Sequence, residues 1–271
     1  MKPEVIKKHY DSCAEKFDNS TKDFSDRLFN RLIITPNLSI LDIGCGSGDI
    51  TFEIHKRYSP KHITGLDISD SLINIAREKQ KKKGIKNIEF VQGSAMDLQF
   101  ADNAFDAVIS NMVFHLLDDQ FQAIKEMYRV LKPGKMAVIT FQGQRPIAPE
   151  FFTLLSAAYE EVTENRQFPE LFNIININDL GNMVDNLGIV NFEVNWNSNI
   201  ASLDKPKLKK YLSWFNLVSG FWKQGLPQVE IEKIENLVNN KIEDHFSRHK
   251  YFRISWSNII FFFTKRGGGN T

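Results

Sequence analysis

The sequence has few cysteines, no excess of one charge and no long hydrophobic run, and each absence excludes a class of protein. The 271 residues include only two cysteines, Cys13 and Cys45, so we expect a reducing compartment and no disulfide scaffold. Lysine plus arginine number 34 against 33 for aspartate plus glutamate. This balance gives no net positive charge that would favour binding to nucleic acid or to an anionic membrane. No run reaches transmembrane length, and residues 1–10 lack a signal-peptide core. These absences predict a cytoplasmic protein without membrane insertion.

The histidines and cysteines do not form a pattern that predicts a metal site. Among the six histidines, only His245 and His249 have the spacing of a ligand pair, because residues four apart share one face of a helix. No third ligand lies near them in the sequence. A surface helix is therefore the preferred interpretation, and no metal is expected.

A glycine-rich turn is the most informative feature that is present. The apolar run 38–43 predicts a buried strand, which three alternating glycines end at Gly44, Gly46 and Gly48 before a helix from about Asp49. A Cβ at Gly44 or Gly46 would obstruct a ligand and disfavour a positive φ. The turn therefore predicts a nucleoside-bearing ligand at the carboxyl end of this strand.

Two aspartates beside this turn indicate which ligand. Asp67 ends a second strand, nineteen residues after the last glycine, where its carboxylate can accept hydrogen bonds from both ribose hydroxyls. Asp42 precedes the glycines, whose spacing differs from the G-x-G-x-x-G fingerprint of dinucleotide sites. A carboxylate there would repel a pyrophosphate but suits a cation. S-adenosylmethionine has a sulfonium, an ammonium and no phosphate, so it is the predicted cofactor, with Asp42 near its amino-acid end.

Three further segments follow in order, at 88–100, 105–115 and 130–140. With the glycine turn and Asp67, they resemble a class I S-adenosylmethionine-dependent methyltransferase over about residues 38–141. The resemblance is to the group with small-molecule acceptors, which includes quinone-biosynthesis and malonyl-carrier-protein methyltransferases. It implies an α/β fold with a Rossmann-like, seven-stranded, mostly parallel sheet and helices on both faces. The last strand is expected to be antiparallel, between the fifth and sixth.

The expected elements form a single domain of residues 1–271. Alternating strand and helix signals predict parallel strands near 38–43, 62–67, 87–92, 105–110 and 135–141. The resemblance adds strands at 190–195 and 257–263. Two insertions, at about 148–173 and 202–253, exceed the minimal fold and are expected to form a helical lid.

The resemblance implies a set of cofactor-binding residues along the carboxyl ends of the strands. They are Tyr10, Asp42, Gly44, Cys45, Gly46, Asp67, Ile68, Ser94, Ala95, Met96 and Asn111. Ser94 departs from the pattern, because many relatives have an aspartate there that accepts from the adenine amino group. A neutral hydroxyl is a weaker acceptor, so we expect the backbone of Ala95 and Met96 to contribute more. Tyr10 is expected to close over the cofactor; the alternative is a helix that only packs on the sheet edge.

Two apolar helical stretches, 149–165 and 206–222, are expected to recognise the acceptor. The predicted acceptor contacts are Phe152, Trp214, Phe215 and Trp222. A roof of these aromatic rings predicts a small, largely apolar acceptor. The alternative is that the rings only bury one another.

Methyl transfer from a sulfonium is an in-line displacement, so the site must place the acceptor atom next to the methyl group and exclude water. An oxygen or acidic carbon must also lose a proton. His115 follows the fourth strand and is the candidate base, although it can instead shape this loop. Asn111 is expected to line the floor beneath the methionyl portion.

The sequence is also compatible with other functions. A carrier-protein-bound acyl acceptor would need a basic entrance, for which Lys205, Lys207, Lys209 and Lys210 are available. A non-catalytic module that binds S-adenosylmethionine would share the same glycine turn. Nucleic-acid methylation is disfavoured because no Asn/Asp-Pro-Pro-Tyr motif follows the fourth strand and the chain is not basic.

Overall fold

The computed structural model describes residues 2–16, 28–143, 149–164, 166–170, 172, 173, 175, 177–189 and 191–267. At residues 177 and 214–219 it describes the backbone alone. The chain forms two compact units. The sheet unit comprises residues 1–141, 173–196 and 259–271, and the helical unit comprises residues 142–172 and 197–258.

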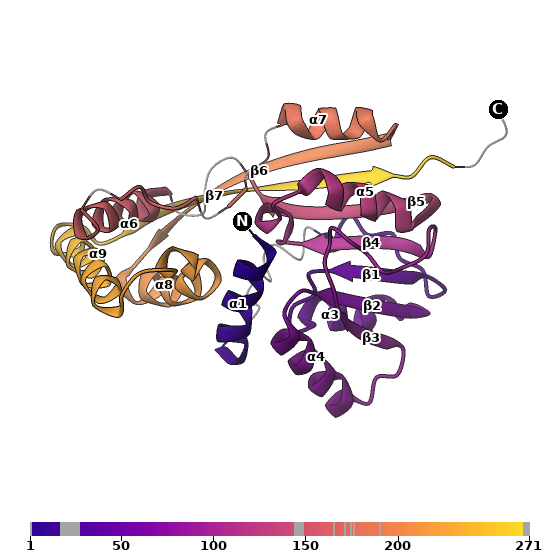
Figure 1. The fold of residues 1–271 in the computed structure, drawn as a ribbon, viewed down its shortest axis with the longest axis horizontal. Helices are drawn as coiled ribbons and strands as arrows, with labels where there is room; N and C mark the ends of the chain where they lie inside the picture. Colours follow the sequence, from indigo (N-terminus) through magenta and orange to yellow (C-terminus); the bar gives the residue numbers. More distant parts are fainter. Residues whose placement is uncertain are drawn as a thin grey trace. The chain divides into compact units, whose positions relative to one another are not determined.

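A seven-stranded sheet organises the fold, in the order β3-β2-β1-β4-β5-β7-β6 (Figure 1). Its strands are β1 (Ser39–Ile43), β2 (His62–Asp67), β3 (Ile88–Gln92), β4 (Phe105–Asn111), β5 (Leu131–Gln142), β6 (Asn191–Leu203) and β7 (Phe252–Thr264). The first five pair in parallel. This order confirms the predicted position of the last strand between the fifth and sixth.

The direction of β7 follows from its hydrogen bonds to β5. Near the start of β5, Gly134 N donates to Lys265 O at 2.9 Å, whereas Gly143 N, just past the end of β5, donates to Ser257 O at 2.8 Å. Residue numbers rise along one strand as they fall along the other. The two strands are therefore antiparallel, as expected.

Residues on the sheet alternate between two hydrophobic cores because successive side chains of a strand point to opposite faces. In β4, Val108 belongs to one core and Ala107 and Ile109 to the other. In β7, Phe261 and Ile260 divide in the same way. Both faces of β1 and β4 are buried, which explains the nearly continuous apolar runs of these strands.

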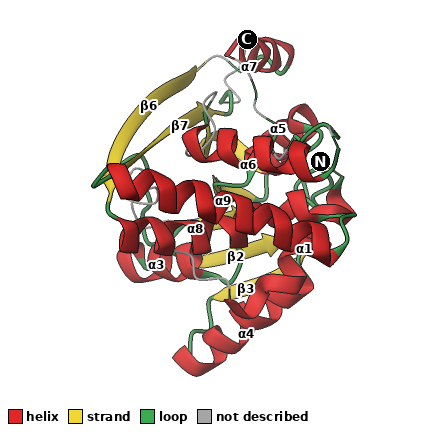
Figure 2. Cartoon of the chain, turned by 90° about the vertical axis from the view of Figure 1, so that its left-hand side faces the viewer, coloured by secondary structure: helices red, strands yellow, loops and turns green. Residues whose placement is uncertain are grey.

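The helices of the sheet unit are α1 (Pro3–Cys13), α3 (Asp49–Tyr58), α4 (Asp70–Lys83), α5 (Gln120–Val130) and α7 (Ile177–Asn186), with 3-10 turns η1 (Ala14–Lys16) and η2 (Phe114–Leu116). The helical unit has α6 (Pro149–Val162), α8 (Lys205–Ser219), η3 (Gly220–Lys223) and α9 (Gln228–Arg248). Helix α6 packs against α9 (Figure 2). None of the described helices is long and apolar enough to cross a membrane.

The ends of several elements differ from the sequence-based ranges. Strand β6 continues to Leu203, and β7 begins at Phe252. The added part of β6 has a polar sequence, and half-exposed or exposed residues follow one another along it. Edge strands of this kind lack the apolar alternation on which the prediction depended.

Candidate active site

The glycine turn, residues 44–48, is shaped by the chain itself. Gly44, Gly46 and Gly48 have φ values of 71°, 54° and 85°, a region that disfavours side chains. Gly44 N and Cys45 N both donate to Leu66 O, at 2.6 and 3.0 Å. A Cβ at Gly44 would lie 2.1 Å from Val113 Cγ2. At this position the absence of a side chain is required by packing before any ligand is considered.

Asp67 joins the glycine turn to the loop that follows β2. Its Oδ2 accepts from Gly46 N and its Oδ1 from Ser69 N, both at 2.9 Å. Burial raises the pKa of this carboxyl group, against the lowering effect of these hydrogen bonds. Two carboxylate oxygens offer about four acceptor positions, so Asp67 retains capacity for a ligand.

Asp42 lies at the end of β1 and is 1% exposed. Its Oδ2 accepts from Thr51 Oγ1 at 2.6 Å, which ties the strand to the first turn of α3. Burial raises the pKa of Asp42 to about 6, and the hydrogen bond from Thr51 limits the rise. A nearby cationic group would favour the ionised form.

Helix α1 is fastened to the start of α4. Asp11 Oδ1 accepts from Ser69 Oγ at 2.6 Å and from Ser71 N at 3.2 Å. Lys7 Nζ lies 2.7 Å from Asp11 Oδ2 and 2.6 Å from Asp70 Oδ2. These contacts hold the neighbouring Tyr10 close to Asp67.

The Tyr10 hydroxyl has a raised pKa. Burial raises this pKa, and the negative charge of Asp67 raises it further. The structure therefore brings together three of the predicted cofactor residues, Tyr10, Gly46 and Asp67, from α1, the glycine turn and β2.

The segment after β3 has its own hydrogen bonds. Ser94 Oγ accepts from Met96 N at 3.2 Å, and Ala95 is buried in a hydrophobic core. The Ser94 hydroxyl and the Met96 backbone amide are therefore already hydrogen-bonded to each other. Ile68 lies beside Asp67, and its carbonyl accepts from Gln92 Nε2 at 3.3 Å. Cys45 is 3% exposed, and burial raises the pKa of its thiol, so it is not a reactive cysteine.

The end of β4 is held by β5. Asn111 Oδ1 accepts from Thr140 Oγ1 at 2.6 Å, and Met112 N donates to Thr140 O at 2.8 Å. Met112 has a φ of 59°, a conformation that is strained for a long side chain and is frequent at functional sites. His115 follows in η2 and is 5% exposed. Burial lowers its pKa to about 3, so its imidazole is neutral at physiological pH.

Parallel pairing places these segments at one edge of the sheet. Ile43, the last residue of β1, pairs with Leu66 of β2 and with Ser110 of β4. The glycine turn, Asp67 and Asn111 therefore follow adjacent strand ends. The chain builds the sheet outward from β1 in both directions, first through β2 and then through β4. Ligands of doubly wound sheets bind at this reversal of strand order.

The predicted acceptor residues belong to the helical unit. The ring of Phe152 lies 6.4 Å from Phe168 and 6.3 Å from Phe172, centroid to centroid, in edge-on arrangements. Trp222 is 1% exposed, and within the described residues its Nε1 has no hydrogen-bond partner. The side chains of Trp214 and Phe215 lie outside the described residues. Their contact with an acceptor stays a prediction.

The structure also adds residues that the sequence analysis did not select. Asp11, Thr51, Ser69 and Thr140 hold the predicted cofactor residues in place. No motif marks them, because each acts across the fold. In the described part of the chain, no group of three or more His, Cys, Asp or Glu side chains is arranged to hold a metal ion.

Comparison with known proteins identifies the family. A family model described as a methyltransferase domain matches residues 34–191, more than half of the chain. Demethylmenaquinone methyltransferase of Listeria welshimeri is 29% identical over 195 residues, which cover 62% of this chain and 83% of that protein.

Solved structures show the same fold. The YcgJ protein of Bacillus subtilis has a TM-score of 0.60 at 18% identity, covering 90% of this chain and 98% of that one. Phosphoethanolamine N-methyltransferase 2 of Haemonchus contortus, solved with S-adenosyl-L-methionine, has a TM-score of 0.55 at 18% identity, covering 92% of this chain and 52% of that one. With the glycine turn and the family match, this fold confirms the assignment: the chain belongs to the methyltransferase domain family, as a class I S-adenosylmethionine-dependent enzyme.

Proposed function

We propose that the protein methylates a small, largely apolar acceptor by in-line displacement. The observation that carries this proposal is the placement of Asp67 against Gly46 and Tyr10, at the edge where β1, β2 and β4 end. When bound, S-adenosylmethionine supplies a methyl group on a sulfonium, which a nucleophilic atom of the acceptor attacks. The protein binds and orients both molecules and excludes water.

The residues present fit this cofactor. Asp67 has remaining acceptor capacity for ribose hydroxyls, and its links to Gly46 and Ser69 fix its orientation. Asp42 is a buried carboxyl group near the glycine turn, and a cationic ammonium would stabilise its charged form. Tyr10 is positioned to cover the nucleoside. In this proposal the same three side chains bind the cofactor and close its site.

His115 has two candidate roles. As a general base it would take a proton from the acceptor, but a conjugate-acid pKa of about 3 makes it a weak base. As a neutral buried side chain it would instead shape the loop after β4. Its burial and the hydrogen bond from Asn173 N to its carbonyl, at 2.8 Å, favour the shaping role. His115→Gln should then lower kcat without changing the form of its pH profile.

Demethylmenaquinone is the first acceptor to assay, because the relatives carry its name. The test measures methylated product by mass spectrometry from the full-length protein, S-adenosylmethionine and the reduced quinone. Asp67→Ala is the binding-deficient control. Turnover that requires Asp67 supports the proposal. Cofactor binding without turnover of this or other apolar acceptors would instead favour a binding module.

The aromatic roof can be tested separately with Trp222→Phe, which preserves a buried ring. If the indole contacts the acceptor, kcat/KM for the acceptor should fall by about 1 kcal/mol, or roughly fivefold. Affinity for S-adenosylmethionine should be unchanged. An unchanged kcat/KM would show that the indole only packs within the helical unit.

The carrier-protein alternative receives little support from the lysines of α8. Lys205 pairs with Glu243, Lys209 lies 3.9 Å from the same carboxylate, and Lys207 lies 3.7 Å from Asp204. Nearby acids thus offset much of the positive charge that an acidic carrier protein would need. We therefore propose a free small molecule as the acceptor.

A further inference from the structure

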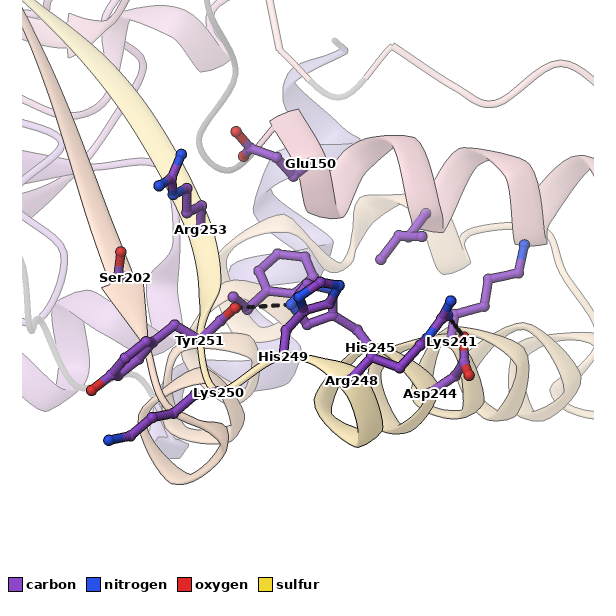
Figure 3. Close-up of a pocket in the computed structure, with 12 residues that line it drawn as sticks. Glu150, Ser202, Lys241, Asp244, His245, Arg248, His249, Lys250, Tyr251 and Arg253 are labelled. Atoms are coloured by element: carbon purple, nitrogen blue, oxygen red, sulfur yellow. Dashed lines mark hydrogen bonds and ion pairs between the residues drawn. The ribbon is translucent and has the colours of Figure 1, made fainter.

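We propose that the helical unit binds a small organic molecule that carries a phosphate group, in a cavity between α6, the carboxyl end of α9 and the start of β7. The cavity measures about 850 Å³ and is formed only by residues of the helical unit (Figure 3). This volume lies within the range of small-ligand sites. The proposal does not depend on the methyl-transfer reaction.

The charges of the lining are the first observation. Four cations and two carboxylates line the cavity: Lys241, Arg248, Lys250 and Arg253 against Glu150 and Asp244. Arg248 and Asp244 form an ion pair. Among the described residues, Lys241 and Arg253 have no ion-pair partner. The cavity therefore concentrates positive charge in a chain whose formal net charge is only +1.

Three other cations of the helical unit are paired. Lys223 Nζ lies 2.5 Å from Glu235 Oε1, Lys205 pairs with Glu243, and Arg166 lies 3.9 Å from Glu230. Among the described residues, Lys241 and Arg253 differ from these three cations because neither has an ion-pair partner. Lys241 and Arg253 suit an anionic ligand, which would form charge-assisted hydrogen bonds with them.

The dipole of α9 does not explain these positions. Cations complement the negative end of a helix only within its last turn, where His245 and Arg248 lie. Lys241 is about two turns earlier, and Arg253 belongs to β7. Figure 3 shows Lys241 and Arg253 on opposite sides of the two imidazoles, while Lys250 points away from them.

Aromatic rings form the surface between these cations. The rings of His245 and His249 lie 4.7 Å apart with an interplanar angle of 35°, and Phe252 lies 5.0 Å from His245. His245 Nε2 donates to Tyr251 O at 2.9 Å, since a carbonyl can only accept, and this bond holds the segment after α9. A flat or apolar ligand body can rest on these rings while its phosphate meets a cation.

Glu150 determines on which side of the cavity a phosphate is expected to bind. It belongs to the first turn of α6 and accepts a 3.4 Å hydrogen bond from Ser255 Oγ. Its negative charge would repel a phosphate from the α6 side of the cavity. The phosphate is therefore expected beside α9 and β7. Removal of this charge should strengthen binding, which a simple loss of structure would not do.

The test is calorimetric titration of phenyl phosphate into the full-length protein. Of Lys241→Gln and Arg253→Gln, the variant that removes the cation in contact with the phosphate should weaken binding about tenfold, and Glu150→Gln should strengthen it about threefold. Lys205→Gln removes a paired cation of the same unit outside the cavity and should have no effect. Phenol should bind more weakly than phenyl phosphate. Inorganic phosphate and vesicles of phosphatidic acid in phosphatidylcholine would distinguish a free phosphate from a lipid headgroup as the source.

The proposal is overturned if neither phenyl phosphate, inorganic phosphate nor phosphatidic acid binds the wild-type protein. It is also overturned if Lys241→Gln and Arg253→Gln bind as the wild type does, or if Glu150→Gln weakens binding. S-adenosylmethionine titrated in parallel should bind all these variants alike. Its binding therefore reports on the proposed methyl transfer separately from the phosphate site.

Discussion

The sheet unit and the helical unit use their charged groups in different ways. In the sheet unit, Asp11, Asp42 and Asp67 all accept hydrogen bonds from the protein. In the helical unit, Lys241 and Arg253 line a cavity and, within the described residues, have no ion-pair partner. A side chain that is hydrogen-bonded within the protein contributes to the stability of the fold as well as to ligand binding. We therefore expect substitutions in the sheet unit to change stability and cofactor binding together, and those in the cavity to change ligand binding alone.

The largest effect is expected for Gly44→Ala. Gly44 and Gly84 both have a positive φ, of 71° and 66°, but only at Gly44 would a Cβ collide with a neighbour, Val113. Gly84→Ala should cost about 1 kcal/mol of unfolding free energy for its backbone conformation. Gly44→Ala should cost roughly 3 kcal/mol or more, because the collision adds to this.

Urea denaturation of both variants measures the difference. Adding Val113→Ala to Gly44→Ala should recover part of the lost stability by making room for the Cβ. Equal losses in the two single variants would show that Val113 does not restrict the glycine turn.

Asp67→Ala is expected to weaken S-adenosylmethionine binding by about 1.5 to 3 kcal/mol, since it removes charge-assisted hydrogen bonds. It also leaves the amides of Gly46 and Ser69 without their acceptor, so stability should fall with affinity. Calorimetry and urea denaturation measure the two effects. Asp97→Ala, which removes an exposed carboxylate, is the control. An unchanged dissociation constant in a folded Asp67 variant would reject the ribose assignment.

Asp42→Asn should change stability and cofactor binding in opposite directions. The folded state raises the pKa of Asp42 from 3.8 to about 6, so the protein binds this proton more tightly when folded. This proton therefore stabilises the folded state. The stabilisation is fully present below about pH 4 and is lost as the pH rises through about 6. Asp42→Asn should therefore raise the free energy of unfolding at pH 7 by about 2 kcal/mol. It should also weaken cofactor binding.

Unfolding curves of the ligand-free protein between pH 4 and pH 8 provide the measurement. The wild-type protein should lose stability relative to Asp42→Asn as the pH rises across this range. A parallel pH dependence in the two proteins would show that Asp42 does not titrate as its burial predicts.

Asp11→Ala is expected to have the smallest of these effects, about 1 kcal/mol on cofactor affinity. It removes the acceptor that joins α1 to Ser69 and Ser71, so Tyr10 would lose its support. We therefore expect S-adenosylmethionine to dissociate faster, which stopped flow measures. This faster dissociation would distinguish the positioning role from general destabilisation. Glu4→Gln, an exposed change on the same helix, should leave the dissociation rate unchanged.

The hydrogen-bond partner of Ser94 could not be predicted from the sequence. The motif correctly places it in the segment after the third strand, and its hydroxyl is an acceptor as expected. Its partner is Met96 N, one of the backbone groups that was predicted to bind adenine. A hydrogen bond between near neighbours depends on the local turn, which the identity of the residues does not specify.

The sequence by itself determined the family, the strands of the parallel sheet and the position of the glycine turn and Asp67. These features depend on short-range patterns: apolar strands, glycines at fixed spacing and an acid at a strand end. Tertiary structure decided the close packing of Val113 against Gly44, the attachment of Asp11 to Ser69 and the burial of His115. It also decided the cavity of the helical unit, which joins residues from α6, α9 and β7. Such contacts bring together residues far apart in the chain, and their geometry arises only when the elements pack.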